Sequence, residues 1–301
     1  MTDSDTKTPR FGFAALIGAP NAGKSTLVNQ LVETKISIVS HKVQTTRARI
    51  RAILVKDDVQ AVLVDTPGIF VPKRKLDEAM VQSAWAGASD ADAVLLLVDA
   101  RRGMDEQVIT IINQLRESNA KAMLVINKTD LLPAEQLLPL SQKLNQAFSF
   151  SETFMVSALN GSGVEKLRER ICAHMPVGPW HYPGDQAADV NMRFLAAEIT
   201  REKIYERLHD ELPYSSTVET DAWEERKDGS VKISQTIFVE RDSQKAIVLG
   251  KGGHTVKTLG QLARADMELS FDRRVHLFLF VKVRENWSND PERLRMMGLS
   301  A

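Results

Sequence analysis

The stretch Gly18-Ala19-Pro20-Asn21-Ala22-Gly23-Lys24-Ser25 decides the fold, because it matches the complete pattern G-x-x-x-x-G-K-[ST] of a phosphate-binding loop. An apolar run with β character, Phe11–Ile17, precedes it, and a helical pattern, Ser25–Val32, follows it. An ordinary tight turn between a strand and a helix does not require these residue types in this order. The stretch therefore predicts a nucleotide-binding loop between a buried strand and a helix.

The physics of phosphate binding accounts for the residue types in this loop. Gly18 and Gly23 allow backbone angles that turn consecutive N–H groups inward around phosphates. The helix that begins near Lys24 points the positive end of its dipole at them. Lys24 is predicted to reach the β- and γ-phosphates, and the Ser25 hydroxyl is predicted to bind Mg²⁺.

Asp65-Thr66-Pro67-Gly68 forms a second box directly after the apolar run Ala61–Val64. A carboxylate at the carboxyl end of a strand, about 40 residues beyond a phosphate-binding loop, is placed to hold Mg²⁺ through water. The N–H of Gly68 is placed to meet the γ-phosphate. Beside the first box, a plain turn is the weaker interpretation, and these residues are predicted to complete the phosphate site.

Asn127-Lys128-Thr129-Asp130 follows the apolar run Met123–Ile126 and predicts which base is bound. The Asp130 carboxylate is placed to accept hydrogen bonds from N1–H and the exocyclic amine of guanine, a pair of donors that adenine lacks. The Lys128 stem is expected to stack on the base, and Asn127 to brace the loop. Here the chain begins to resemble guanine-nucleotide-binding proteins. Their last box is similar to Ser157-Ala158-Leu159, whose N–H at Ala158 is expected to meet guanine O6.

Gln44-Thr45-Thr46-Arg47 lies between the first two boxes and offers a threonine ligand for Mg²⁺ when the γ-phosphate is present. Similarity to related GTPases favours Thr46 over Thr45. The alternative is a polar loop without a ligand.

Length and composition indicate a two-domain soluble protein. The chain has 301 residues, of which 43% are hydrophobic and 26% charged, a balance typical of globular domains. Lys and Arg number 39, as do Asp and Glu, which excludes a uniformly cationic tail but not a basic face. The single cysteine, Cys172, excludes an internal disulfide framework. Short apolar runs and a polar N-terminus predict neither a membrane span nor a signal peptide, so we expect a cytoplasmic protein.

Short apolar runs alternate with helical patterns over the first half of the chain. This order predicts a doubly wound, mostly parallel α/β domain over residues 8–176. Three prolines and two glycines within Met175–Asp185 then predict a linker, which we set at residues 177–188. The helical patterns lie at Asp77–Ala88, Asp105–Glu117, Ala134–Phe148 and Val164–His174.

Residues 189–301 change character and predict a smaller α+β domain. A hairpin signal, Asp228-Gly229, separates two alternating segments, Ser215–Glu225 and Ser230–Glu240. The predicted order is α-β-β-α-α-β, with helices at Asn191–Glu211, Gln244–Leu249 and Thr255–Met267 and a final strand at His276–Val283.

Gly250-Lys251-Gly252-Gly253, between the last two predicted helices, resembles the G-x-x-G loop of KH RNA-binding domains, and the element order matches the type II KH topology. Glycines let the backbone approach a nucleic acid closely, and Lys251 adds charge near phosphate. Eight basic and four acidic residues lie between Asp242 and Arg284, whereas the 57 residues before Asp242 carry five more acidic than basic ones. The electrostatic fields of the two segments are therefore opposite in sign, which suits a groove that binds RNA on one side of the domain. Taken alone, a turn between helices is the other interpretation.

One GTPase domain followed by one KH domain resembles the Era family of ribosome-assembly GTPases, in the TrmE-Era-EngA group, over nearly the whole chain. The resemblance rests on the boxes above, the KH loop, and the segments Arg201–Ile204 and Glu211–Tyr214. It implies GTP hydrolysis with Mg²⁺, binding near the 3′ end of 16S ribosomal RNA, and assistance to 30S subunit assembly. Peripheral association with the inner membrane face is also implied, with only the basic KH face in its favour. We expect a monomer.

Ile69 follows Gly68 where Ras-type GTPases carry the glutamine that orients the attacking water. Isoleucine cannot orient water, so we expect slow intrinsic hydrolysis. In related GTPases an asparagine at the place of Asn21 helps to hold K⁺ near the phosphates, and the resemblance implies K⁺ as a second cation. The residues expected to act in catalysis are Lys24, Thr46, Gly68 and Asn21.

Two other classes of function stay open on sequence grounds. An RNA-binding module with a purely structural nucleotide would show no GTP turnover under saturating RNA. A metabolic kinase is disfavoured by Asn127–Asp130 and by the lack of a second small-substrate motif.

Overall fold

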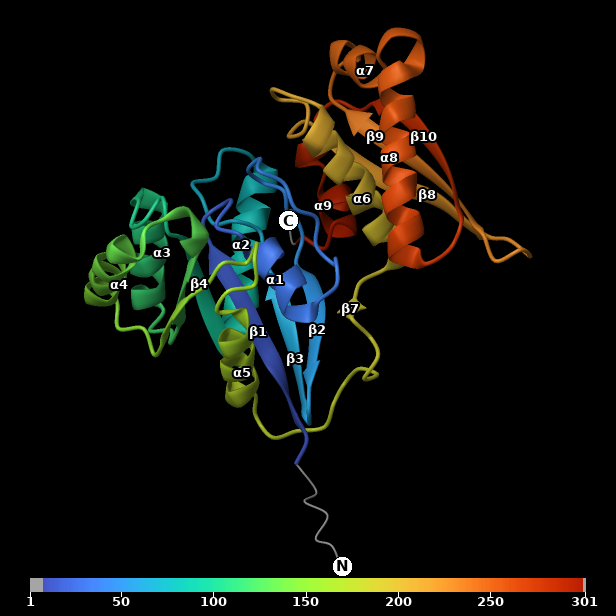
Figure 1. The fold of residues 1–301 in the computed structure, drawn as a ribbon. Helices are drawn as coiled ribbons and strands as arrows, with labels where there is room; N and C mark the ends of the chain where they lie inside the picture. Colours follow the sequence, from blue (N-terminus) through green and yellow to red (C-terminus); the bar gives the residue numbers. More distant parts are fainter. Residues whose placement is uncertain (1–7, 300–301) are drawn as a thin grey trace, which may run out of the picture.

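The computed structural model describes residues 8–299, which form two layered units joined by an extended segment (Figure 1). The first unit is built on a seven-stranded sheet with strand order β6-β5-β4-β1-β3-β2-β7. Its central strands run parallel, whereas β2 is antiparallel to both of its neighbours. The strands are β1 (Arg10–Gly18), β2 (Ile50–Lys56), β3 (Val59–Asp65), β4 (Ala93–Asp99), β5 (Met123–Asn127), β6 (Thr153–Met155) and β7 (Ala188–Asp189).

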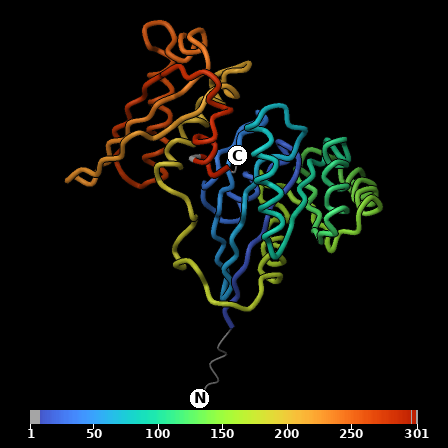
Figure 2. Tube along the Cα trace, turned by 180° about the vertical axis from the view of Figure 1, so that it is seen from behind, coloured from blue at the N-terminus to red at the C-terminus, as the bar shows by residue number. Residues whose placement is uncertain are grey.

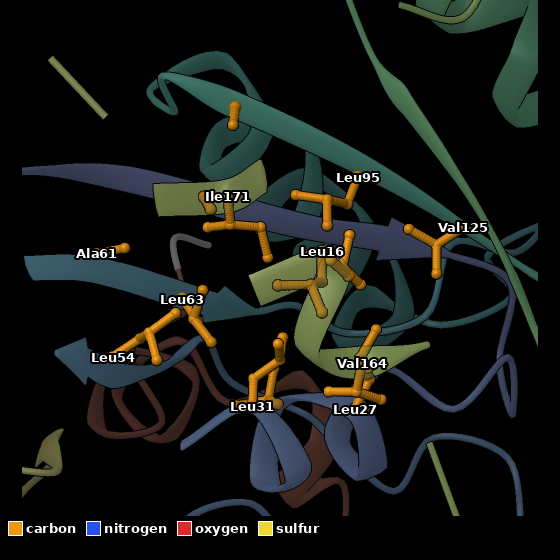
Figure 3. Close-up of a cluster of buried hydrophobic side chains, with 14 of the residues drawn as sticks. Leu16, Leu27, Leu31, Leu54, Ala61, Leu63, Leu95, Val125, Val164 and Ile171 are labelled. Atoms are coloured by element: carbon orange, nitrogen blue, oxygen red, sulfur yellow. The ribbon is translucent and has the colours of Figure 1, made fainter. Parts of the chain in front are cut away.

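Helices cover both faces of this sheet. α1 (Lys24–Val32) and α5 (Val164–His174) pack on one face, where Leu27 and Ile171 join strand residues in one apolar cluster (Figure 3). The helices on the other face are α2 (Lys75–Ser89), α3 (Glu106–Glu117) and α4 (Ala134–Ala147).

The strand β4 shows why the central runs of sequence are continuously apolar. Leu95 and Leu97 pack in the cluster beneath α1 and α5, while Leu96 and Val98 pack in the cluster on the opposite face. A strand that is buried on both faces has no polar side to display. The prediction of a doubly wound, mostly parallel sheet is confirmed.

The strand β2 and the segment after α5 differ from the sequence-based expectation. β2 forms a hairpin with β3, which a search for alternating strands and helices does not detect. The segment predicted as a linker lies along the sheet: the Phe11 and His181 rings stack with centroids 3.9 Å apart, and Gln60 Nε2 donates to Tyr182 O at 2.9 Å. Its last residues continue into β7, which pairs with β2. The predicted domain boundaries remain a prediction.

The second unit has the predicted order α-β-β-α-α-β, and its helices pack on one face of a three-stranded sheet, β10-β9-β8. β8 and β9 form the hairpin, and β10 runs parallel to β9. The elements are α6 (Met192–Arg207), β8 (Ser216–Glu225), β9 (Val231–Val239), α7 (Asp242–Leu249), α8 (His254–Phe271) and β10 (Val275–Val283).

A segment after β10, for which we predicted no structure, returns to the first unit. It contains the short helices η3 (Trp287–Asn289) and α9 (Pro291–Met296). Trp287 is fully buried and shares an apolar cluster with Leu76 and Met80 of α2. Figure 2 shows this red segment lying against the first unit.

Candidate nucleotide-binding site and glycine loop

The loop between β1 and α1 is held in shape by glycines that no other residue could replace. Gly18 has φ 152° and Gly23 has φ 94°. A Cβ atom on Gly18 would lie 2.5 Å from the Leu97 carbonyl oxygen, and one on Gly23 would lie 2.2 Å from Asn127 Nδ2. Both distances are too short for a carbon atom, so the loop can adopt this path only with glycine at these two positions.

Lys24 spans this loop from the first turn of α1. Its buried ammonium donates hydrogen bonds to Gly18 O at 3.0 Å and to Ala19 O at 3.1 Å. Burial lowers the pKa of Lys24 from 10.5 to about 8, while the nearby Asp65 carboxylate raises it. The ammonium is thus a poorly hydrated cation at the place where phosphates are expected.

Three oxygen-bearing side chains converge beside Lys24. Asp65, at the end of β3, is completely buried, and among the residues that the structure describes neither carboxylate oxygen has a hydrogen-bond partner. Ser25 Oγ and Thr46 Oγ1 share a hydrogen bond of 2.8 Å. Burial raises the pKa of Asp65, while the nearby Ser25 hydroxyl and Lys24 ammonium lower it. An unpaired buried carboxylate beside two hydroxyls fits a hard cation such as Mg²⁺.

The turn after β3 packs closely on the phosphate-binding loop. A Cβ atom on Gly68 would lie 2.8 Å from Pro20 Cα, so this position also excludes side chains. Ile69 N donates to Gly18 O at 3.0 Å, and the Ile69 side chain is buried in the core. The side chain after Gly68 therefore points away from the phosphate site, as expected for a residue that does not orient water.

Asn127, at the end of β5, connects the loop to the last box. Its buried amide donates from Nδ2 to Ala22 O at 2.9 Å, and its Oδ1 accepts from the Ala158 N–H at 3.0 Å. The N–H expected to meet guanine O6 therefore donates to Asn127. Ser157 is buried beside it, whereas Leu159 is exposed.

Lys128 and Asp130 frame the expected base site. Lys128 has φ 63°, and its ammonium donates to Asn21 O at 2.6 Å and to Asp99 Oδ2 at 2.7 Å. Asp130 lies in the short helical turn η1 (Thr129–Leu131). Its side chain is exposed and forms no ion pair within residues 8–299. Asp99 was not predicted from the sequence, although it stands at the carboxyl end of β4, where functional carboxylates of parallel sheets are found.

Residues 33–49, which we call the switch segment, close over the loop. Asn21 Nδ2 donates to His41 O at 2.8 Å. Thr45 Oγ1 donates to Lys42 O at 2.8 Å, whereas Thr46 faces Ser25. Of the two threonines that we considered, Thr46 is the one beside the expected cation site.

The switch segment is also bonded to the second unit, which the sequence did not reveal. The buried Arg47 guanidinium donates to Ser216 O at 2.8 Å and to Pro213 O at 2.9 Å, and it lies over the Trp287 ring. Burial lowers the pKa of Arg47, and the nearby Tyr205 hydroxyl raises it.

Further bonds join the switch segment to α6. Lys42 Nζ donates to the Tyr205 and Leu208 carbonyl oxygens at the end of that helix. Glu202 Oε1 accepts from the Val39 N–H at 2.9 Å. The segment that covers the phosphate-binding loop therefore also holds α6.

The Gly250–Gly253 loop leads directly into α8, with φ 72° at Gly250, 61° at Gly252 and 78° at Gly253. A Cβ atom on Gly250 would lie 2.1 Å from Thr255 Oγ1, so Gly250 is required by packing. A Cβ atom on Gly252 or Gly253 would meet nothing within 4 Å. These two glycines leave an open backbone surface beside the exposed Lys251.

Fold and site together define a P-loop GTPase domain followed by a KH domain. The model of the 50S ribosome-binding GTPases matches residues 13–128, and that of the KH domains matches residues 211–288. GTPase Era of Brucella suis is 59% identical over 99% of this chain and 96% of its own length, and GTPase Era of Afipia carboxidovorans is 59% identical over 99% and 97%. The chain belongs to the GTPase Era family and is a GTPase.

Solved structures agree over nearly the whole chain. A variant of Aquifex aeolicus Era bound to GDP·AlF4⁻ superposes with a TM-score of 0.92 at 35% identity, covering 97% of this chain and 100% of the other. Era in complex with MgGDPNP and nucleotides 1506–1542 of 16S ribosomal RNA gives a TM-score of 0.92 at 34% identity, with the same coverage. Within residues 8–299, no helix is both long and apolar enough to cross a membrane.

Proposed function

We propose that this protein is a GTP-dependent switch that binds the 3′ region of 16S ribosomal RNA and assists assembly of the 30S subunit. The proposal rests on the Gly250–Gly253 loop. At Gly252 and Gly253 no atom of the described residues lies within 4 Å of the place of a Cβ atom, so the backbone is open to a ligand. A relative that superposes over nearly the whole chain was solved with this RNA region and MgGDPNP.

The nucleotide is bound between the phosphate-binding loop and the base box. Residues 18–25 wrap the phosphates, Lys24 neutralises the β- and γ-phosphates, and Gly68 N–H meets the γ-phosphate. Mg²⁺ is held by Ser25 and Thr46, with Asp65 acting through water. The Lys128 stem covers the guanine and Asp130 reads its N1 edge, while Asn127 keeps Ser157–Leu159 beside the base. Asn127 supports this arrangement because it bonds both loops at once.

Hydrolysis needs help from another group, because Ile69 cannot orient the attacking water. Asn21 is suited to hold K⁺, because its amide bonds the His41 carbonyl and thereby brings backbone oxygens of the switch segment to the phosphate-binding loop. Such a cation would stabilise negative charge that develops on the transferred phosphate.

The switch segment transmits the state of the nucleotide to the KH domain. It covers the Ser25 hydroxyl with Thr46 and holds the second unit through Arg47 and Lys42. Loss of the γ-phosphate makes the position of Thr46 less stable. The bonds between the switch segment and α6 then weaken as well. RNA is accordingly held differently in the GTP and GDP states.

The closing experiment compares two glycine substitutions in the same domain. Gly253→Asp places a negative side chain where phosphates pass, and we expect RNA affinity to fall at least a hundredfold. Gly229→Asp is the matched control: Gly229 has φ 80°, has nothing within 4 Å of its Cβ position, and lies on the distant β8–β9 hairpin. Both variants should keep GTP turnover without RNA.

Filter binding measures the affinity for a 3′-terminal 16S fragment, and circular dichroism confirms folding. Normal RNA binding by folded Gly253→Asp would show that the loop is only a turn, and the RNA half of the proposal would be rejected.

We further propose that the protein works as a monomer in the cytoplasm. Peripheral contact with the inner membrane face would use the basic KH face. Flotation with anionic vesicles tests it, and Lys251→Glu should reduce any bound fraction.

A further inference from the structure

We infer that the outer face of β10 is a stacking platform on which Phe278 and Phe280 receive unpaired bases of the bound RNA. This inference rests on the proposed function. It adds to the glycine loop a second contact of a different chemistry, aimed at bases instead of the sugar-phosphate backbone.

β10 is an edge strand, and its side chains alternate between two environments. Within the part of the chain that the structure describes, it pairs only with β9. Leu277, Leu279 and Val281 pack against the helices on the inner face. Phe278 and Phe280 point to the opposite face and are 47% and 52% exposed.

The neighbouring strand leaves the two rings uncovered. Phe278 pairs with Ser234 and Phe280 pairs with Thr236, both of which are small polar residues. α9 covers the same sheet face beside the rings, over β9, where the Arg293 guanidinium lies 4.1 Å from the centroid of Phe238, the register partner of Lys282. The two phenylalanine rings therefore remain accessible although other parts of this face are packed.

The spacing and chemistry of the rings suit a single strand of RNA. Residues two apart on a strand project to one side, roughly 6.6 Å from each other. Other RNA-binding sheets stack two or three bases on aromatic rings arranged in this way. Every base has a π-face, so such a platform needs no particular sequence.

The side chains that flank the rings on β10 are basic. On β10 itself, His276 and Lys282 flank the aromatic pair on the same face, and Lys282 is exposed and forms no ion pair with the residues described here. The acidic residues of this face lie on β8: Glu219 pairs with Arg293 and Glu224 with Lys232, whereas Asp221 accepts a hydrogen bond from the Thr236 hydroxyl and forms no ion pair in the described part of the chain. Two exposed rings beside the Lys282 cation suit a nucleic acid, which presents bases next to phosphates.

The glycine loop lies on the helical side of the sheet, and only the free edge of β10 separates it from the platform on the other side. Leu279, between the two phenylalanines, lies against Gly260 of α8, where a Cβ atom would be 3.4 Å from Leu279 Cδ1. α8 begins at His254, directly after the loop, so Gly260 lies about 9 Å along the helix axis from its start. The exposed Lys257 lies between them along the chain. A strand that passes the loop can thus cross the free edge of β10 and reach the rings.

The test separates stacking from charge. The double variant Phe278→Leu/Phe280→Leu keeps apolar side chains but removes both π-faces. We expect at least a tenfold loss of affinity for the single-stranded 3′-terminal 16S fragment, with an unchanged slope of log K against log salt. Phe278→Tyr/Phe280→Tyr should restore the affinity. Lys282→Gln should instead reduce the slope by about 0.7.

Leu269→Ala is the control for loss of an exposed apolar side chain, because Leu269 is 84% exposed on α8, and it should bind RNA normally. Affinity within twofold of the unaltered protein for the leucine double variant overturns the platform, as does failure of the tyrosine variant to rescue. If that face serves a protein instead, the leucine variant also binds RNA normally. The proposed function fails separately, through normal RNA binding by Gly253→Asp.

Discussion

Lys24 is a titratable group at the phosphate site, and its pKa of about 8 makes nucleotide binding depend on pH. Bound phosphates favour the ammonium, so above pH 8 binding must take up a proton. We expect the affinity for GDP to fall about twofold from pH 7 to 8 and up to about tenfold by pH 9. Calorimetry checks this, and Lys24→Met should bind more weakly without that pH dependence. An equal decline in Lys24→Met would assign the titration to another group.

The same shift affects the nucleotide-free protein with the opposite sign. Between pH 8 and 10.5 the unfolded chain binds more protons at Lys24 than the folded chain does. This group alone therefore makes the free energy of unfolding rise with pH in that window.

Asp130 determines the choice of base if the site is as proposed. Asp130→Asn exchanges an acceptor for a donor at the N1 edge, so we expect preference for XTP over GTP. Asp99→Asn is the matched control, since Asp99 bonds Lys128 at 2.7 Å. It should weaken both nucleotides and keep the preference for GTP. Unchanged selectivity in Asp130→Asn, measured by calorimetry, would refute the assignment.

Asn21 is expected to make hydrolysis depend on K⁺. K⁺ should speed GTP turnover relative to Na⁺ at equal ionic strength, and Asn21→Ala should abolish the difference. This expectation rests on the hydrogen bond from Asn21 to the His41 carbonyl oxygen. Equal rates in the two salts would reject a K⁺ site and leave RNA or the ribosome to supply the missing charge.

The switch segment and α6 are joined by hydrogen bonds, so we expect them to move together. Arg47→Met removes its donors to the Ser216 and Pro213 carbonyls, which lowers the free energy of unfolding by about 2–3 kcal/mol. We expect the ratio of RNA affinities in the GTP-analogue and GDP states to approach one, while nucleotide affinity changes little. Arg51→Met is the control, because its pair with Asp189 is exposed. A preserved ratio in folded Arg47→Met would exclude Arg47 from the coupling.

Features that depend on neighbouring residues could be predicted from the sequence. Features that depend on contacts between residues far apart along the chain could not. The phosphate-binding loop was predictable because Gly18 and Gly23 meet strict local limits on φ. Arg47 was unremarkable in sequence, since its partner Ser216 lies 169 residues away. α9 has only six residues, and nothing in its own sequence shows that the segment packs on α2.

At the scale of the whole molecule, the two units meet on both sides of the nucleotide site. The switch segment bonds α6, and the segment around Trp287 packs on α2, which follows Gly68. Both segments that flank the γ-phosphate position therefore contact the second unit. A change in either can alter how the KH domain sits, which is why we expect RNA binding and nucleotide state to depend on each other.

The packing of Trp287 on α2 also has a meaning for the order of synthesis. Leu76 and Met80 belong to the first unit, but Leu294 and Leu299, which help to bury them, are translated after both units. A nascent GTPase domain thus carries an apolar patch on α2 until these late residues arrive. Packing of the GTPase domain is completed by residues that follow β10, so a chain interrupted before residue 287 would leave Leu76 and Met80 of α2 uncovered.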